Sequence, residues 1–217
     1  MSTAEAESRT ARNKRTFDRA VDIAAVALIS LAAVLSAVCG YQSGRWSGLQ
    51  SRMYALASAT RIEAAEAGTK SIALTAIDVA TFLQFINAYE EHDAKKTAFL
   101  YQRFRPVMRT ATAEWIAARP LLNPKAPSTP FAIPSYLRAA HAAERGLAEQ
   151  ATADFEAAQT ANEHADAFLL LTVTFAGVSF LAGMSTKFVF PQHVIVIGVG
   201  CIVFIYGIIR IVELPFR

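Results

Sequence analysis

The chain has 217 residues, of which 53% are apolar and 18% are charged, and its formal net charge is +3. Soluble domains are usually about 45–50% apolar, so the excess indicates a membrane protein. Between Gln42 and Asp166 the charges balance, because Lys/Arg and Asp/Glu residues occur there in equal numbers. A surface that binds nucleic acid needs an unbalanced basic stripe, so no nucleic-acid partner is expected.

The basic end of the chain lies in residues 1–19, which contain four arginines and Lys14. The first 16 residues are small, polar and charged, which predicts a disordered tail. Cations close to a membrane span favour the cytoplasmic side, so the N-terminus is expected in the cytoplasm and residues 45–166 outside it. A signal peptide has the same layout, but the apolar run that follows is long and lacks a small-x-small cleavage site, which favours an uncleaved anchor.

Three blocks lack Asp, Glu, Lys and Arg, and they lie between Asp22 and Arg45, between Asp166 and Lys187, and between Lys187 and Arg210. About 20 apolar residues are needed to cross a bilayer, and a segment in lipid must be helical to satisfy its backbone. We therefore predict an all-α integral membrane protein with transmembrane helices at 20–44, 167–187 and 192–212. Residues 45–166 are expected to form an extramembrane antiparallel helical bundle continuous with the first and second spans.

The first membrane helix is predicted to continue outward to about Glu91, because no proline occurs from Asp18 to Arg105 and good helix formers dominate. Gly68 is the weak point, since glycine costs up to about 1 kcal/mol relative to alanine inside a helix. Either Gly68 breaks this helix, or its end forms a hairpin that extends beyond the third exposed helix. The second alternative is favoured.

The segment Glu91–Asp93 is typical of a turn, with Asp93 as the N-cap of a helix that runs to about Ala118. Pro106 should kink or split that helix. A further helix is predicted from about Ser135 straight into the second span, because no proline follows until Pro191. The pair Phe190-Pro191 then indicates the turn between the second and third spans.

Residues 120–134 contain five of the eight prolines, which predicts an extended loop with polyproline character. Such a segment can dock into an aromatic groove, and the candidate interaction residues are Pro127, Pro130, Phe131 and Pro134. The favoured alternative is a rigid strap with Phe131 and Leu121–Leu122 packed on the bundle. The core of the distal tip is predicted from an aromatic set: Phe82, Phe85, Tyr89, Phe99, Tyr101, Phe104 and Trp115.

A row of small residues in the first span includes Ala32, Ser36 and Gly40, at intervals of four. Such rows let helices approach closely in lipid. The row is compatible with an oligomer interface and equally with packing among the chain's own three spans. A passive pore lined by hydroxyl groups would use a different set: Ser30, Ser36, Thr172, Thr174 and Ser179.

Chemical motifs are scarce in this sequence. The spans carry no ionisable group at depth, which argues against a proton-coupled transporter. Cys39 and Cys201 lie in apolar spans without metal-ligand spacing, and no nucleophile, Walker or dinucleotide motif occurs. We therefore expect no catalytic residue, metal or cofactor, and an enzyme of lipid or envelope chemistry is the least favoured class.

The layout resembles small, uncharacterised bacterial inner-membrane proteins with an N-terminal span, a helical extracytoplasmic domain and a C-terminal two-span hairpin. The resemblance rests on Tyr41-Gln42 with Arg45-Trp46, on Arg103-Phe-Arg-Pro106, on the Pro-Phe-x-x-Pro loop at Pro130–Pro134, and on Asn162 with Asp166. It implies a bacterial inner membrane. A looser similarity is to the helical input domains of bacterial sensors, from which the chain differs by lacking an output domain.

Two functions follow from these expectations. The first is a non-enzymatic membrane scaffold, assembly or sensory subunit that acts through its exposed helical domain and helix packing in the bilayer. The second is a homo-oligomeric channel or permease. The expected partners are the lipid bilayer and either the protein itself or another membrane protein.

Overall fold

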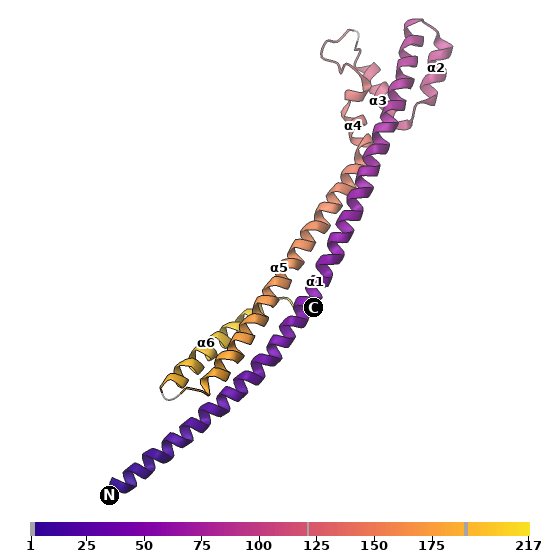
Figure 1. Ribbon diagram of the computed structural model, residues 1–217. Coiled ribbons are helices and arrows are strands. Elements are labelled where there is room, and N and C mark those ends of the chain that lie inside the picture. Colours follow the sequence, from indigo (N-terminus) through magenta and orange to yellow (C-terminus); the bar gives the residue numbers. More distant parts are fainter. Residues whose placement is uncertain (1–2, 121, 189–190) are drawn as a thin grey trace. The chain divides into compact units, whose positions relative to one another are not determined.

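The computed structural model describes residues 3–120, 122–188 and 191–217, and these residues contain helices and no β-strand (Figure 1). The all-α prediction is confirmed. The helices are α1 (Thr3–Glu90), α2 (Ala94–Arg103), α3 (Pro106–Ala117), the 3₁₀ helix η1 (Pro130–Ala132), α4 (Pro134–Ala140), α5 (Ala142–Ser185) and α6 (Gln192–Glu213). Three of them, α1, α5 and α6, contain stretches long and apolar enough to cross a membrane.

The chain divides into two compact units. The span unit comprises Met1–Met53 with Glu156–Arg217, and the helical domain comprises Tyr54–Phe155. The predicted spans 20–44, 167–187 and 192–212 all fall in the span unit, and the helix that carries the second one, α5, ends at Ser185, two residues before the predicted boundary. Phe190 of the predicted inter-span turn lies outside the described residues, whereas Pro191 is the N-cap of α6.

The N-terminal segment differs from expectation, because α1 already begins at Thr3 rather than after a disordered stretch of 16 residues. The physical reason is composition: alanine, glutamate and arginine dominate residues 4–15, all of them good helix formers, and neither glycine nor proline interrupts them. A helix already nucleated in the apolar block gains one hydrogen bond for each further residue at little cost.

Gly68 does not break α1, so the favoured alternative of an unbroken first helix is confirmed. A Cβ at position 68 would lie 3.1 Å from Cδ of Glu144 on α5. The absence of a side chain at Gly68 therefore creates the room in which the Glu144 carboxylate lies. The Glu144 carboxylate also accepts a hydrogen bond from the ring of His141, with 3.0 Å between Oε2 and Nδ1.

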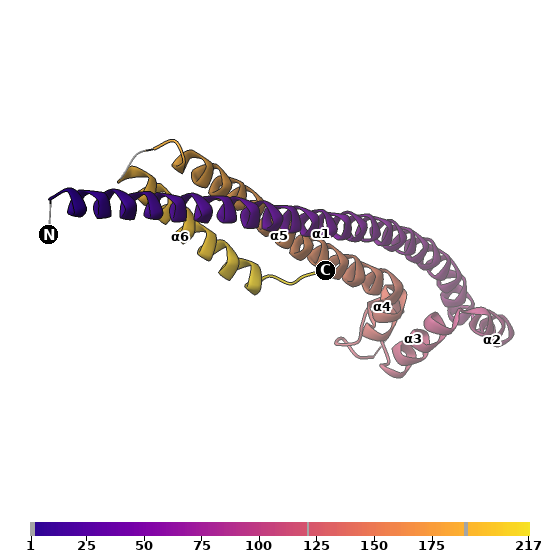
Figure 2. The ribbon, with the colours of Figure 1, turned by 90° about the horizontal axis from the view of Figure 1, so that it is seen from below.

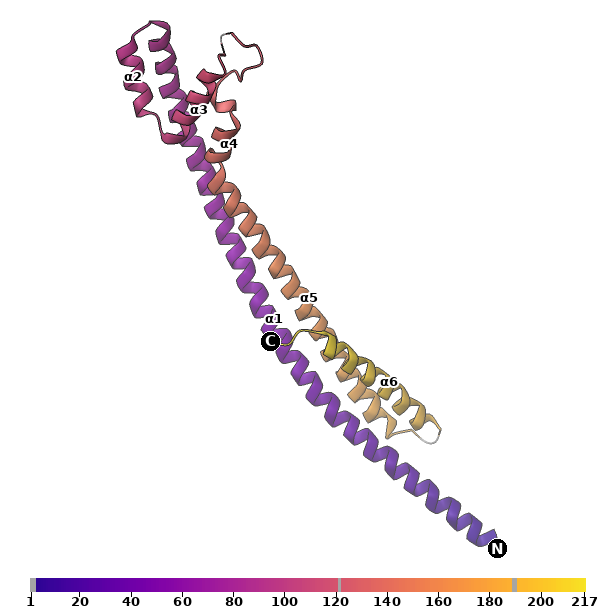
Figure 3. The same cartoon turned by 180° about the vertical axis from the view of Figure 1, so that it is seen from behind.

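In the span unit, α6 runs back beside the C-terminal half of α5 (Figures 1 and 3). The hydrophobic core joins all three helices, and its buried residues are Leu28, Ala32, Cys39, Trp46, Ala161, Ala165, Phe168, Leu171, Phe175, Val178, Ala182 and Ile211. Two hydroxyls cross between helices: Ser36 donates to the carbonyl of Thr172 at 3.1 Å and Ser43 to that of Ala165 at 2.9 Å. Small residues and hydroxyls of this kind allow close packing of helices in lipid.

The last residues of the chain are fixed to α1 within the same unit. The Gln42 side chain pairs with the backbone of Arg217, donating to its carbonyl at 2.8 Å and accepting from its N–H at 2.9 Å. The Trp46 indole N–H donates to the carbonyl of Pro215 at 3.1 Å, and the Arg217 guanidinium lies 4.8 Å from the Trp46 ring centre. Buried polar groups of Gln42 and Trp46 thus obtain partners from the extended segment after α6.

The turn after α1 and the N-cap of α2 lie where they were predicted. Asp93 caps α2, since its side chain accepts a hydrogen bond from the N–H of Lys96 at 3.0 Å. Pro106 splits the next predicted helix rather than kinking it, and it stands in the first turn of α3. Proline is tolerated there because its missing N–H has no intrahelical acceptor in the first turn.

The predicted continuous helix from about Ser135 into the second span is wrong at one point, because His141 separates α4 from α5. His141 has φ −105° and ψ 8°, outside the range of a regular helix. The interruption leaves the carbonyl of Ala140 for the hydroxyl of Ser71, which donates to it at 2.8 Å. Neither glycine nor proline marks this break in the sequence, so it depends on the tertiary contact. α3 and α4 lie close to each other in this domain (Figures 1 and 2).

Candidate ligand pocket in the helical domain

The helical domain contains an aromatic core to which α1, α2, α3 and α4 all contribute. Its buried residues are Phe82, Phe85, Phe104, Met108, Ala111 and Tyr136. Trp115 and Phe131 both pack edge-to-face on Phe82, with ring centroids 5.5 and 5.6 Å from it. Most of the predicted aromatic set is found here, but two of its members are not part of the core. Phe99 is 52% exposed and lies under the guanidinium of Arg103, and Tyr89 is 50% exposed.

A pocket of about 840 Å³ adjoins this core. It is lined by Phe82, Leu83, Phe85, Ile86, Tyr89, Glu90, His92, Trp115, Ile116, Arg119, Pro120, Leu122 and Ser128. The volume falls in the range of about 300–1,000 Å³ that is typical of small-molecule sites, and so does the predominance of apolar and aromatic side chains. The C-terminal ends of α1 and α3 and the loop after α3 therefore form a concave apolar surface.

The pocket also carries charge. Glu90 and Arg119 both line it, and neither forms an ion pair with any other residue that the structure describes. Charged groups without a protein partner at the edge of an apolar pocket can orient a bound molecule, because they are the groups that still lack a hydrogen-bond partner. The indole N–H of Trp115 is not available in this way, since it donates to the carbonyl of Pro127 at 2.8 Å.

Two pocket residues have backbones in the left-handed region, His92 with φ 59° and Arg119 with φ 51°. They are the non-glycine residues with positive φ in the described part of the chain, and each follows the C-terminus of a helix. Glycine usually occupies such a position, because a Cβ there costs about 1–2 kcal/mol. Strained backbone tends to gather at functional sites, and here both instances face the same pocket.

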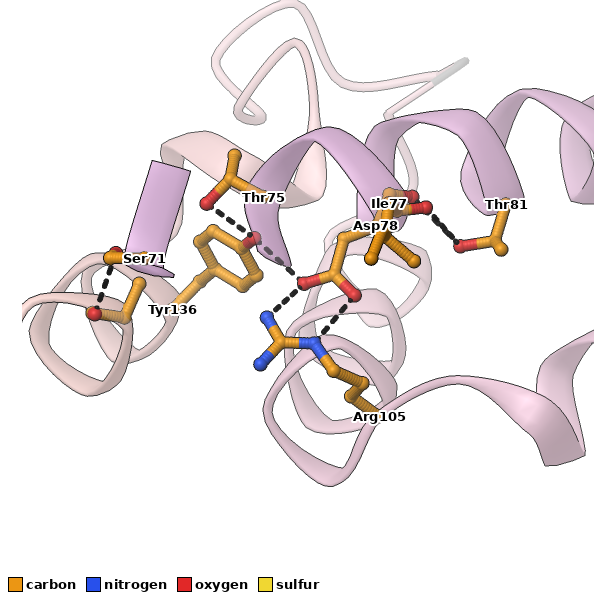
Figure 4. A network of polar contacts seen from close by, with 8 residues as sticks. Ser71, Thr75, Ile77, Asp78, Thr81, Arg105 and Tyr136 are labelled. Atoms are coloured by element: carbon orange, nitrogen blue, oxygen red, sulfur yellow. Dashed lines mark hydrogen bonds and ion pairs between the residues drawn. The ribbon is translucent and has the colours of Figure 1, made fainter. Parts of the chain in front are cut away.

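A buried polar network joins α1, which lines the pocket, to the residue before α3 and to α4 (Figure 4). Asp78 of α1 is 1% exposed and receives two hydrogen bonds from Arg105, from Nε at 2.9 Å and from Nη2 at 2.5 Å. The Tyr136 hydroxyl of α4 donates to Oδ2 of Asp78 at 2.9 Å and lies 3.3 Å from Oγ1 of Thr75. A bidentate arginine–carboxylate pair fixes geometry as well as charge, so this network holds α1, the start of α3 and α4 together.

Two groups of the network have shifted pKa values. Burial raises the pKa of the Tyr136 phenol above its usual value, and its hydrogen bond to Asp78 adds to the rise. The hydrogen bonds to Asp78 raise the pKa of Arg105 in turn, which keeps the guanidinium charged. Both directions favour the arrangement drawn in Figure 4, with a neutral phenol and a charged guanidinium on one carboxylate.

The shifted pKa of Tyr136 predicts a loss of stability in alkali. A group whose pKa is higher in the folded state stabilises the fold fully below the unfolded value, about 10 for tyrosine, and this stabilisation is lost as pH rises through the folded value. We expect the free energy of unfolding to fall more steeply above pH ~10 in the wild type than in Tyr136→Phe. Denaturant unfolding between neutral pH and strong alkali checks this; parallel curves for the two proteins would contradict it.

The proline-rich loop supplies part of the pocket lining, namely Pro120, Leu122 and Ser128. Phe131 packs on Phe82 and on Tyr136, as the strap alternative predicts, and Pro130 is buried within η1. Leu122 is 80% exposed, so its predicted packing on the bundle is wrong, and Leu121 lies outside the described residues. Pro127 supplies the carbonyl that Trp115 binds, and Pro134 is the first residue of α4.

The predicted small-residue row of the first span separates into two environments. Ala32 is fully buried in the span-unit core and Ser36 bonds to α5, so both take part in packing within the chain. Gly40 is exposed, and a Cβ added to it would lie 3.8 Å from Oγ1 of Thr172. The hydroxyls proposed for a pore each donate to a backbone carbonyl of the same chain: Ser30, Ser36, Thr172, Thr174 and Ser179.

Sequence reasoning did not identify the pocket. Its aromatic residues were assigned to the core, and nothing in the letters His92 and Arg119 marks a left-handed backbone. The described residues also contain no group of three or more His, Cys, Asp or Glu side chains placed to hold a metal ion. We found no family model, curated protein or solved structure that matches the chain.

Proposed function

We propose that the protein is a membrane-anchored sensory subunit whose helical domain binds a small apolar molecule. The observation that supports this is the pocket of about 840 Å³, which is lined by aromatic and aliphatic side chains and has unpaired charges in its wall. Pockets of this size and composition bury most of the surface of a small ligand. Among the roles of scaffold, assembly subunit and sensory subunit, a ligand pocket favours the sensory subunit.

The candidate spans supply the membrane anchor in this proposal. The membrane in this proposal is a bacterial inner membrane, as the resemblance implies. The five cations before the first span favour a cytoplasmic N-terminus, with the helical domain on the opposite side as an antiparallel bundle. The pocket residues Phe82 to Glu90 and the first candidate span belong to one helix, α1. A ligand that alters the end of α1 can therefore affect how the spans pack against a partner protein, provided that it binds two states with different affinity.

The test is a binding measurement on the full chain in lipid nanodiscs. The chain has two tryptophans, so Trp46→Phe leaves the pocket residue Trp115 as the single indole donor. We expect a naphthylamine probe to quench Trp115 emission by energy transfer in a saturable manner. Quenching that rises linearly with the probe, as in partition into lipid, would refute a pocket.

A matched pair of variants locates the binding. Ile116 lines the pocket, whereas its exposed neighbour Ala117 does not. We expect Ile116→Glu to lower the affinity for the probe at least about tenfold, because a carboxylate in an apolar wall loses hydration, and Ala117→Glu to leave it unchanged. Equal affinity in both variants would place the probe elsewhere and overturn the proposed site.

A further inference from the structure

α1 carries a second apolar face in the helical domain, opposite the face that packs inside the chain. The outer face consists of residues spaced alternately three and four apart: Ile62, Ala65, Thr69, Ile72, Ala76 and Val79. Leu83 and Ile86 continue the spacing, but both line the pocket, so the outer face ends at Val79. Its larger members are exposed, with Ile62 at 60%, Ile72 at 70% and Val79 at 37%. The buried positions of the same helix, such as Ala64, Ser71 and Asp78, fall between them, two residues after an outer-face position.

The spacing of the outer face is that of a helix pairing seam. Residues at intervals of seven form the positions a (Ile62, Thr69, Ala76) and d (Ala65, Ile72, Val79) of a heptad pattern. None of these six residues is charged, although the face lies outside the three predicted spans. An exposed apolar strip of this length on an extramembrane helix marks an interaction site rather than a solvated surface.

We infer that the outer face pairs with the same face of a second copy of the chain, with the two α1 helices parallel and in register. Two copies anchored in one bilayer with the same orientation leave the membrane in the same direction, so their α1 segments are parallel. The small residues Ala65, Thr69 and Ala76 allow the two backbones to approach closely. The hydroxyl of Thr69 already donates to the carbonyl of Ala65 at 2.9 Å, so burying Thr69 between two helices leaves no hydrogen-bond donor without a partner.

The charges beside the seam fit this occupant. In the heptad pattern Arg61 is at position g and Glu66 at position e, and in a parallel pair a g residue meets the e residue five positions later on the partner. Arg61 of each copy would therefore meet Glu66 of the other, giving two ion pairs related by the twofold axis. Neither residue forms an ion pair within its own described chain; the Arg61 guanidinium lies 5.0 Å from the Phe155 ring centre.

Neighbouring cysteines test the register in the full chain in membranes. A background of Cys39→Ala with Cys201→Ser removes both native thiols. Thr69 and Ala76 are a positions, while the exposed residues Lys70 and Ile77 follow them on another face. We expect Thr69→Cys and Ala76→Cys to form disulfide-linked dimers under mild oxidation at least about fivefold more than Lys70→Cys and Ile77→Cys, because a disulfide requires Cα atoms within about 7 Å.

A charge exchange tests the ion pairs in the Ala76→Cys background. Arg61→Glu and Glu66→Arg should each reduce the cross-linking, since they place like charges together, and the double exchange should restore it. Equal cross-linking at Ala76→Cys and Ile77→Cys, a monomeric mass in nanodiscs, or a double exchange without recovery would overturn the inference. So would an Ala76→Cys adduct to a different protein, which would assign the outer face to another partner.

Discussion

Replacing Arg105 with methionine is expected to lower the free energy of unfolding of the helical domain by about 3 kcal/mol, because the substitution leaves the Asp78 carboxylate buried without its counter-charge. The Asp78 side chain is 2% exposed, so water cannot replace the two hydrogen bonds from the guanidinium. The expected cost is at the lower end for such pairs, since the Arg105 side chain itself is 32% exposed.

The two partners of this pair should respond unequally. Asp78→Leu removes the buried charge, and the partly exposed Arg105 can turn toward water, so we expect a smaller loss than for Arg105→Met. The double variant Asp78→Leu with Arg105→Met should be more stable than Arg105→Met alone, as found when a buried ion pair is replaced by apolar side chains. Denaturant unfolding followed by Trp115 emission in a Trp46→Phe background measures all three; a double variant less stable than both single variants would contradict the argument.

Arg105→Met should also weaken ligand binding in the pocket. Arg105 precedes α3, and α3 carries the pocket residues Trp115 and Ile116. Without the bidentate pair the start of α3 is held by fewer contacts to α1, so we expect weaker binding of the naphthylamine probe by Arg105→Met under conditions in which the variant is still folded. Unchanged affinity would show that the aromatic contacts alone position the α3 wall of the pocket.

Several elements could be predicted because their determinants are local. The uncharged block after Asp22 and the lack of proline up to Arg105 specify one long helix, and Asp93 and Pro106 carry their own cap and break chemistry. The break at His141 could not be predicted in this way, because it depends on Ser71, far away in the sequence. Local signals determine helix ends only where the residue itself caps a helix or cannot continue one.

The candidate site was harder to predict from the sequence, again because its determinants are not local. Asp78 is the single charge in an apolar stretch of α1, and its partners Arg105 and Tyr136 are 27 and 58 positions away. The left-handed backbone at His92 and Arg119 has no glycine to signal it. The heptad spacing of the outer face of α1 is present in the sequence. It is hard to recognise there, because the buried positions of the same helix recur with a similar period.

The close approach of α6 to α5 leads to the other large expected effect, at Gly207. A Cβ at this position would lie 2.7 Å from Cζ and 2.8 Å from Cε1 of Phe175, whose side chain is fully buried. The Phe175 ring cannot easily move, because it also packs edge-to-face on Phe204 at 5.7 Å. Gly207→Leu should therefore destabilise the span unit by about 3 kcal/mol or more, as overpacking of a filled core does.

Gly198, on the same helix, provides the matched control, since nothing lies within 4 Å of a Cβ built there. We expect Gly198→Leu to have little effect or a small stabilising one, because leucine favours the helix more than glycine does. Adding Phe175→Ala to Gly207→Leu should recover part of the loss, since the smaller side chain makes room for the new one. The stability of each variant is measured by unfolding with increasing amounts of a denaturing detergent, followed by near-ultraviolet circular dichroism. Equal stability of the two leucine variants would show that α6 does not pack through Gly207.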